Sequence, residues 1–192
     1  MSNKNQSREK ILKAATRLFH LKGYHATGLN QILQESGAPK GSLYYHFPNG
    51  KEQLAAEAIQ LSGQIIAADI QTRFNAFDDP VKAFQHKIQL LAEQFNQIEK
   101  LAEIPTVPLG LLAAETALVN ENLRQICEET FEMWGKLYIE KLMASGYSEE
   151  RARLISTSMN ALIEGGVTLC LTRKSSEPLL QIQKMIPLLL AK

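Results

Sequence analysis

Apolar residues recur three and four positions apart along most of the chain, and no segment alternates regularly between apolar and polar side chains. The first spacing places apolar side chains on one face of a helix, whereas strict alternation would indicate a β-strand. The pattern therefore predicts an all-α protein with about nine helices. Their expected ranges are 7–21, 27–36, 39–47, 51–77, 80–99, 111–119, 122–144, 148–172 and 178–190.

Capping side chains and residues with special backbone preferences mark the limits of the first three helices. Ser7 and Thr27 carry hydroxyl groups that can cap the first turn of a helix, and Gly23 and Gly37 follow the last turns of the first two helices. Pro39 has a fixed φ that suits the beginning of the third helix. A longer helix followed by two short helices across a glycine turn predicts a helix-turn-helix unit.

The predicted helices divide into two groups. Residues 1–50 form the helix-turn-helix domain, and residues 51–192 form a larger helical bundle. An irregular link is expected at 100–110 because this segment contains two prolines, and Pro187 is expected to kink or end the last helix. The chain is therefore predicted to have a small N-terminal domain and a larger C-terminal domain.

The net charge of +1 is unevenly distributed, with +5 on residues 1–54 and −4 on the remainder. Nucleic-acid-binding proteins use such a basic segment to contact phosphates, while an acidic body limits unspecific coating of DNA. The same imbalance also arises by chance in small helical domains, so it favours DNA binding without establishing it.

The composition disfavours several classes of protein. No stretch without Asp, Glu, Lys or Arg runs much past about a dozen residues, which is too short for a transmembrane helix, and the first residues are polar, unlike a secretory signal. Cys127 and Cys170 are isolated, so neither a zinc site nor a disulfide is expected. Motifs of hydrolases, metalloproteases and phosphate-loop enzymes are also missing. We expect a cytoplasmic protein that is not an enzyme, contacts no membrane and needs no metal or cofactor.

Residues 22–54 carry the strongest functional signal. They read KGYHATGLNQILQESGAPKGSLYYHFPNGKEQL. Over roughly thirty residues this segment resembles the signature of the TetR family of bacterial transcriptional regulators, through its Lys-Gly-Tyr, its glycine turn and its Lys-Gly-Ser-Leu-Tyr-Tyr-His-Phe. The resemblance implies a recognition helix that lies in the major groove of DNA with its N-terminal residues at base edges.

The resemblance also implies DNA contacts at individual positions. Lys40 is placed for a base edge or a phosphate, and Tyr44 and Tyr45 are placed to donate hydrogen bonds to phosphates. Lys51 begins the fourth helix, where its charge and the helix N-terminus favour a phosphate. Either tyrosine could instead belong to the core, His46 could be a capped surface side chain, and either lysine could simply be solvated. The complete set of expected DNA-binding residues is Thr27, Asn30, Lys40, Gly41, Ser42, Tyr44, Tyr45, His46 and Lys51.

Three segments of the larger domain carry a second resemblance. They read PLGLLAAET at 108–116, LIEGG at 162–166 and EPL at 177–179. Together with the FPNGK turn, these segments resemble the LmrA/YxaF-type subgroup of TetR regulators. Some members of that subgroup release DNA on binding flavonoids, so the resemblance implies a planar polyphenol as the effector class.

Aromatic and flexible apolar side chains on the bundle helices are candidates for lining an effector pocket. Few charged residues that could fix an ion lie among them. Ordinary core packing is the alternative at each position, because helical stripes of aromatic residues are mostly core. The candidates are Phe95, Leu112, Phe131, Trp134, Tyr138 and Met159.

The last two long helices predict a dimer interface. They carry more apolar surface than a small bundle needs, and Gly165-Gly166 inside a helix indicates close approach of a partner helix, because interior glycines destabilise a helix. The TetR resemblance implies a four-helix interface built from these two helices of each subunit. A two-fold dimer would read a pseudo-palindromic operator. The candidate interface residues are Leu162, Gly166, Cys170, Leu179, Ile182 and Ile186.

These patterns and resemblances predict a ligand-responsive repressor that binds a double-stranded DNA operator as a homodimer and releases it on binding a small aromatic effector. A DNA-binding regulator without a small-molecule effector remains the alternative, either responding to a protein partner or acting architecturally. Activation also stays open, because its sign depends on where the operator lies relative to the promoter.

Overall fold

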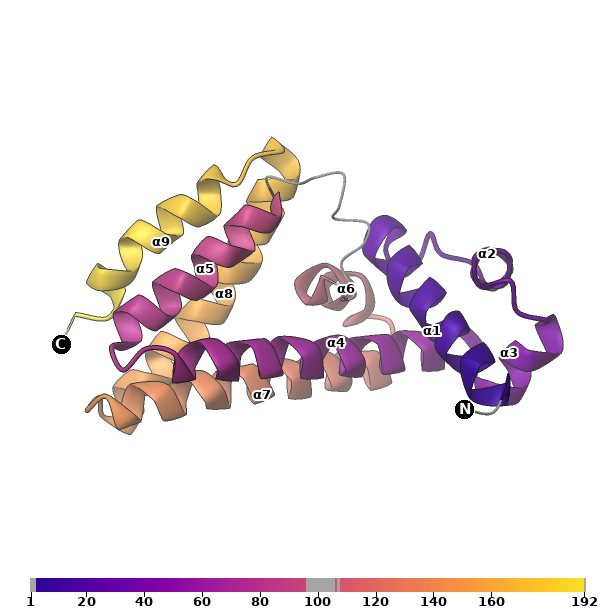
Figure 1. Cartoon of the computed structure of the whole chain (residues 1–192), viewed down its shortest axis with the longest axis horizontal. Coiled ribbons are helices and arrows are strands. Elements are labelled where there is room, and N and C mark those ends of the chain that lie inside the picture. Colours follow the sequence, from indigo (N-terminus) through magenta and orange to yellow (C-terminus); the bar gives the residue numbers. More distant parts are fainter. Residues whose placement is uncertain (1–2, 96–105, 107, 192) are drawn as a thin grey trace. The chain divides into compact units, whose positions relative to one another are not determined.

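The computed structural model of the chain describes residues 3–95, 106 and 108–191, with side chains described from residue 6 (Figure 1). Within those ranges the chain forms nine helices and no strand, which confirms the all-α prediction. The helices are α1 (Asn3–Lys22), α2 (Leu29–Ser36), α3 (Lys40–His46), α4 (Gly50–Asn75), α5 (Pro80–Phe95), α6 (Leu109–Thr116), α7 (Glu121–Ala144), α8 (Glu149–Arg173) and α9 (Glu177–Leu189).

Two of the predicted helix caps are wrong. Helix α1 begins at Asn3, so Ser7 lies inside the helix and does not cap it. The N-cap of α2 is Gly28 rather than Thr27, and the Gly28 N–H donates to Oε1 of Gln31 at 3.2 Å. The glycine end of α2 is as predicted, because Gly37 follows it with a left-handed φ of 64°.

The later helix limits agree with the predictions to within a few residues. Pro187 lies inside α9, and the helix continues to Leu189, after which the Leu190 N–H donates to the Ile186 carbonyl at 3.0 Å. The expected end of the fifth helix at 96–99 and most of the expected link at 100–110 fall outside the described residues.

The chain separates into two compact units. One comprises Met1–Gln64 with Ala102–Thr130, and the other comprises Ile65–Leu101 with Phe131–Lys192. Helices α4 and α7 therefore each contribute one part to either unit. The functional boundary expected after residue 50 stays a prediction, because compactness alone does not say where a DNA-binding domain ends.

The first unit packs around α1, which contacts both α2 and α3 (Figure 1). Helix α7 is tied to α4 within this unit, because Nδ2 of Asn122 donates to Oε1 of Glu52 at 2.9 Å. Burial deprives the Cys127 thiol of solvation and raises its pKa to about 11, so this cysteine stays a protonated free thiol at neutral pH. The fully buried side chains of this unit include Ile11, Phe19, Ile32, Leu43, Phe47, Leu54 and Ile59.

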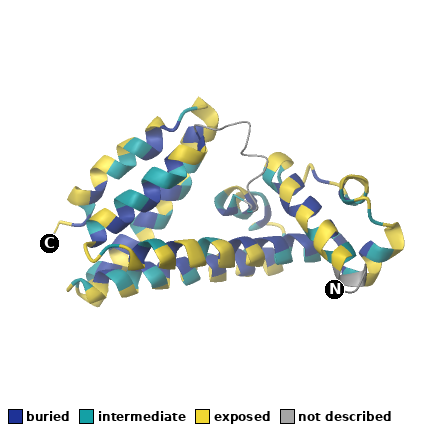
Figure 2. Ribbon diagram, in the orientation of Figure 1, coloured by how far each residue is buried: buried dark blue, intermediate teal, exposed yellow. Residues whose placement is uncertain are grey.

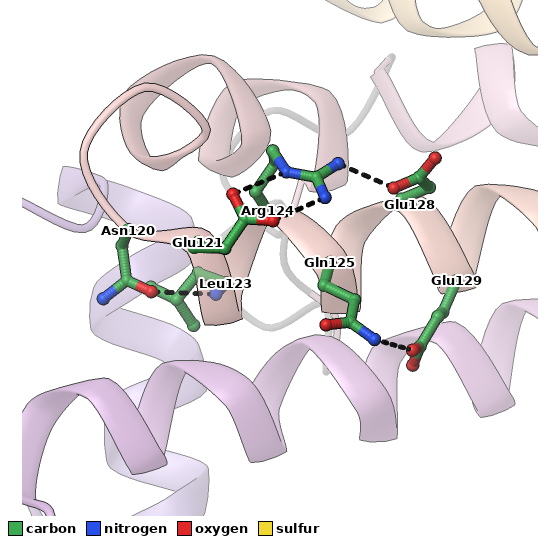
Figure 3. A network of polar contacts seen from close by, with 7 residues as sticks. All are labelled: Asn120, Glu121, Leu123, Arg124, Gln125, Glu128 and Glu129. Carbon is green, nitrogen blue, oxygen red and sulfur yellow. Dashed lines mark hydrogen bonds and ion pairs between the residues drawn. The ribbon is translucent and has the colours of Figure 1, made fainter.

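The beginning of α7 is stabilised by polar contacts along its surface (Figure 3). Asn120 caps the helix through its side-chain oxygen, which accepts the Leu123 N–H at 2.9 Å. One turn further on, Arg124 pairs with Glu121 at 2.7 Å and with Glu128 at 2.6 Å. Solvent-exposed pairs of this kind contribute little to the stability of the folded chain, so the capping contact is the more important one.

The second unit places α5, α8 and α9 side by side (Figure 1). Its interior contains three mutually contacting rings, with centroid separations of 4.8 Å between Phe74 and Phe84, 5.3 Å between Phe84 and Tyr138, and 5.8 Å between Phe74 and Tyr138. Lys87 of α5 is also buried here, with Nζ 5.9 Å from the centroid of the Tyr138 ring. This unit therefore buries a cation against an aromatic cluster.

Helix α8 is long and apolar enough to cross a membrane, and it is the one helix of the described residues that meets this test. Its apolar positions are used elsewhere, because Ile155, Met159, Ile163 and Cys170 are buried and the helix packs against α9. Core helices of ordinary helical bundles have the same character, so the length and composition of α8 are weak evidence for a membrane.

Candidate DNA-binding site

One side of helix α3 is polar and exposed, and the opposite side carries the apolar residues that are buried. Leu43 and Phe47 lie four residues apart and are fully buried, whereas Tyr44 and Tyr45 are 48% and 69% exposed. Figure 2 shows buried and exposed residues mixed along the ribbon of the N-terminal helices. Lys40, at the N-terminal end of the helix, is also exposed. The alternative in which either tyrosine belongs to the core is therefore wrong, and the outward face carries one cation and two phenol groups.

Contacts from α1 and α4 orient α3. Ser7 Oγ of α1 lies 3.0 Å from Ser42 Oγ, and Nε2 of Gln53 in α4 donates to the His46 carbonyl at 3.3 Å. The His46 ring meets the Tyr45 ring nearly edge-on at a centroid distance of 4.9 Å. Ser42 and His46 are half-buried. Both side chains thus keep an accessible edge while their neighbours fix their positions.

The two residues expected to contact DNA from the second helix lie in different environments. Asn30, in the first turn of α2, is exposed. Thr27 is only 1% exposed, and its hydroxyl donates to the Gly23 carbonyl at 2.7 Å and to the Leu18 carbonyl at 3.2 Å. The Thr27 hydroxyl therefore closes the end of α1, and its side chain is not available at the surface.

Lys51 lies in the first turn of α4 and is partly covered by the turn that follows α1. Its Nζ lies 4.4 Å from the centroid of the Tyr24 ring and donates to the His25 carbonyl at 3.4 Å. Partial burial lowers the pKa of the Lys51 ammonium, while the negative charge of Glu115 opposes this shift. Lys51 is thus an ordered cation rather than a freely solvated one.

Glu115 of α6 was not expected at this site, yet it contacts the same turn. Its Oε2 accepts the Tyr24 N–H at 2.5 Å and the His25 N–H at 3.4 Å. The His25 ring returns a contact, because its Nε2 lies 3.0 Å from the Glu115 carbonyl. Another histidine, His20 in the last turn of α1, has Nδ1 2.7 Å from the Thr106 carbonyl just before α6. Four polar contacts therefore join α6 and its approach to the end of α1.

Both partners of the contact between Tyr24 and Glu115 lie in motifs noted in the sequence, but no sequence pattern indicates that they are in contact. Tyr24 belongs to the Lys-Gly-Tyr motif and Glu115 to the PLGLLAAET segment, and they are separated by 91 residues. Local periodicity reports on neighbours within a few turns, so a contact at this separation is invisible to it. Alignment of many related sequences could have detected the pair through correlated changes.

Two family profiles match the chain. The profile described as "Bacterial regulatory proteins, tetR family" matches residues 11–58, and the profile described as "Transcriptional regulator LmrA/YxaF-like, C-terminal domain" matches residues 80–185. The chain belongs to the TetR family of transcriptional regulators. The C-terminal match confirms the resemblance to the LmrA/YxaF subgroup.

Relatives of similar length support this assignment. The HTH-type transcriptional regulator YxaF of Bacillus subtilis is 50% identical over 192 residues, covering 100% of this chain and 99% of the relative. The HTH-type transcriptional regulator LmrA of the same organism is 54% identical over 184 residues, covering 96% of each. These relatives are regulators, so the expectation that this TetR-family protein is not an enzyme is confirmed.

Solved structures share the fold of this TetR-family chain. A TetR transcriptional regulator from Legionella pneumophila superposes with a TM-score of 0.81 at 22% identity, covering 98% of this chain and 97% of that one. A TetR-family regulator from Cytophaga hutchinsonii gives a TM-score of 0.82 at 19% identity, with coverages of 99% and 96%. At this level of identity the likeness concerns the fold alone.

The six candidate effector-binding residues of this TetR-family chain are divided between the units. Leu112 belongs to the first unit and is fully buried, whereas the other five belong to the second. Four of these five are at most 6% exposed, and Phe131 is half-buried, 5.6 Å from the Trp134 ring. Tyr138 packs in the three-ring cluster described above. Their role in binding an effector stays a prediction.

Gly166 has a different partner from the one expected of a dimer interface. A Cβ at this position would lie 2.7 Å from Cδ1 of Ile182 and 2.8 Å from Cδ2 of Leu179, both in α9 of the same chain. The close approach predicted from Gly165-Gly166 is therefore made within one protomer, and Gly165 itself faces open space. Cys170, Leu179 and Ile186 are also fully buried within the protomer.

An apolar groove of about 480 Å³ runs along α8 and α9 of this TetR-family chain. Leu162 and Ile182 of the predicted interface line it. The groove is also lined by three residues that no sequence pattern singled out, Leu169, Met185 and Leu188, which are 44%, 53% and 67% exposed. The spacing of apolar residues does not say which face of α8 or α9 packs within the chain. The exposed apolar residues could therefore not be distinguished from the buried ones by sequence.

Proposed function

We propose that this TetR-family regulator is a homodimeric repressor that binds a pseudo-palindromic operator through α3 and releases it on binding a small, planar, flavonoid-like aromatic effector. It acts in the cytoplasm and needs no cofactor for this role. The observation that carries the proposal is the outward face of α3, where Lys40, Tyr44 and Tyr45 are exposed above the buried Leu43 and Phe47.

The exposed face of α3 suits a DNA major groove. Lys40 lies at the N-terminal end of the helix, where a recognition helix contacts base edges. Tyr44 and Tyr45 supply hydroxyl donors for phosphates, which position the helix without reading sequence. Gly41 is exposed, and a Cβ there would meet no protein atom within 4 Å, so the DNA backbone has room to approach. Asn30 and Lys51 add contacts from the flanking helices.

The apolar groove along α8 and α9 supports dimerisation and, with it, a symmetric operator. The groove along these helices is lined mainly by Leu, Ile, Met and Pro side chains, whose burial against a second copy would be favourable. A two-fold dimer carries two recognition helices and so reads two half-sites related by the same symmetry.

The effector class is supported by the LmrA/YxaF resemblance, because some members of that subgroup release DNA on binding flavonoids. The aromatic and apolar character of the candidate residues in the second unit agrees with such a ligand. The effector need only prefer the arrangement that does not bind DNA, and DNA must then weaken effector binding by the same factor. A coupling free energy of about 2 kcal/mol corresponds to roughly thirtyfold.

Fluorescence anisotropy tests the proposal directly. The protein is titrated onto a labelled duplex from upstream of its own gene at fixed salt, with and without quercetin, and onto a scrambled duplex as the control. We expect sequence-selective binding that quercetin weakens. Selective binding that quercetin and a broad aromatic panel leave unchanged would establish a regulator without this effector. A transcription assay on the same promoter distinguishes repression from activation.

A further inference from the structure

The turn at Gly23–His25 binds the carboxylate of Glu115 closely. The Tyr24 N–H donates to Oε2 at 2.5 Å, and the His25 N–H donates to the same oxygen at 3.4 Å. Gly23 makes room for this carboxylate, because a Cβ there would lie 2.3 Å from Oε1. Its φ of 78° is also one that other residues rarely adopt. The turn is therefore shaped around an acidic side chain that comes from α6.

The same turn holds Lys51. The Tyr24 ring lies under Nζ at 4.4 Å, within the range of a cation–π contact, and the His25 carbonyl accepts from Nζ at 3.4 Å. Glu115 thus contacts the backbone N–H groups of the two residues whose ring and carbonyl hold the ammonium of Lys51. Glu115 and Lys51 are therefore connected through the Gly23–His25 turn, which each of them contacts.

We propose that Glu115 is a positioning residue for DNA binding, which fixes the Gly23–His25 turn and thereby sets where the Lys51 ammonium meets the DNA backbone. This inference rests on the proposed function, in which Lys51 contacts a phosphate. It assigns a role in DNA binding to a residue of α6, outside the helix-turn-helix segment.

The sign of the expected effect separates positioning from simple electrostatics. A carboxylate near bound DNA repels phosphates, so its removal should strengthen binding if charge were its only influence. Loss of positioning has the opposite sign, because Lys51 would then lose its phosphate contact. Each neutralised phosphate adds about 0.9 to the salt slope, which corresponds to about fivefold in affinity per protomer at 0.15 M salt.

The first experiment measures operator affinity and its salt dependence by anisotropy for three variants. Glu115→Ala is expected to weaken binding up to about fivefold per protomer and to lower the salt slope by up to about 0.9 per protomer. Glu115→Gln, which keeps an oxygen acceptor for the Tyr24 N–H, is expected to recover most of both. Glu129→Ala, an exposed change of equal charge in α7, is expected to leave affinity unchanged or raise it slightly. Tighter binding by Glu115→Ala would overturn the proposal.

A double-mutant cycle with Lys51→Ala tests whether Glu115 acts through Lys51. The double variant is expected to bind no more weakly than Lys51→Ala alone. Fully additive losses would refute positioning through Lys51 and assign Glu115 a general structural role, which thermal unfolding of Glu115→Ala would register. Unchanged binding by Lys51→Ala would refute both the Lys51–phosphate contact and this inference. The rest of the proposed interface is judged separately by Lys40→Ala.

Discussion

The buried ammonium of Lys87 should make the folded protein less stable at neutral pH than it would be with an apolar residue at this position. Lys87 is 8% exposed, and burial lowers its pKa from 10.5 to about 8. The charges of Asp69 and Glu164 oppose this shift without cancelling it, and Arg73 adds to it. The Tyr138 ring at 5.9 Å offers a weak cation–π contact at most.

The magnitude and the pH window follow from these two pKa values. Each pKa unit is worth about 1.4 kcal/mol, so the lowering from 10.5 to about 8 destabilises the folded state by about 3 kcal/mol wherever both states are protonated. Between pH 8 and 10.5 the unfolded chain holds one proton more than the folded chain, so stability rises with pH. The destabilisation is complete below pH 8 and falls below about 1 kcal/mol near pH 10.

Lys87→Met removes the charge and keeps an unbranched side chain of similar length. We expect it to raise the free energy of unfolding by about 2–3 kcal/mol at pH 7 and by less than about 1 kcal/mol at pH 10. Urea unfolding at fixed protein concentration measures both values, and Lys82→Met on the exposed side of α5 is the control. A destabilised variant at pH 7, or a gain that is the same at both pH values, would refute the reasoning.

Three further predictions concern the DNA-binding face, the α8–α9 packing and the groove. Lys40→Ala should weaken operator binding by about 1–3 kcal/mol and blur base preference, which anisotropy on a panel of mutated operators would detect. Gly165→Ala should stabilise the fold by up to about 1 kcal/mol in urea unfolding, whereas Gly166→Ala should gain less or be neutral, because its Cβ would meet the ends of the Ile182 and Leu179 side chains at 2.7 and 2.8 Å and these must shift. Met185→Asp with Leu188→Asp should shift the protein to monomers in sedimentation velocity while helicity by circular dichroism is retained.

The helices were largely predictable because their signal is local. Apolar spacing located all nine helices of the described residues, and Gly37 ended α2 as expected. The caps at Ser7 and Thr27 were wrong because a hydroxyl near a helix end has several partners within reach. The hydroxyl of Ser7 forms a hydrogen bond with the hydroxyl of Ser42 in α3, and the hydroxyl of Thr27 donates to a carbonyl at the end of α1.

The site was only partly predictable because part of it depends on contacts between distant segments. The exposed residues of α3 could be predicted because the sequence of this helix resembles the TetR signature. Glu115 lies on another helix, and nothing in its own segment says that it contacts Tyr24. Gly166 shows the same limit in another form, because a helical glycine indicates a close neighbour without saying whether that neighbour belongs to the same chain.

The absence of a side chain at Gly166 ties the evolution of α8 to that of α9. The side chain of Ile182 occupies the space that a side chain at position 166 would need, and it also lines the exposed groove. A relative with a larger residue at 166 is expected to compensate with a smaller one at 182 or 179, and that change would reshape the groove. A residue that lies beneath the surface of this TetR-family chain would in this way set the shape of a groove that it does not itself line.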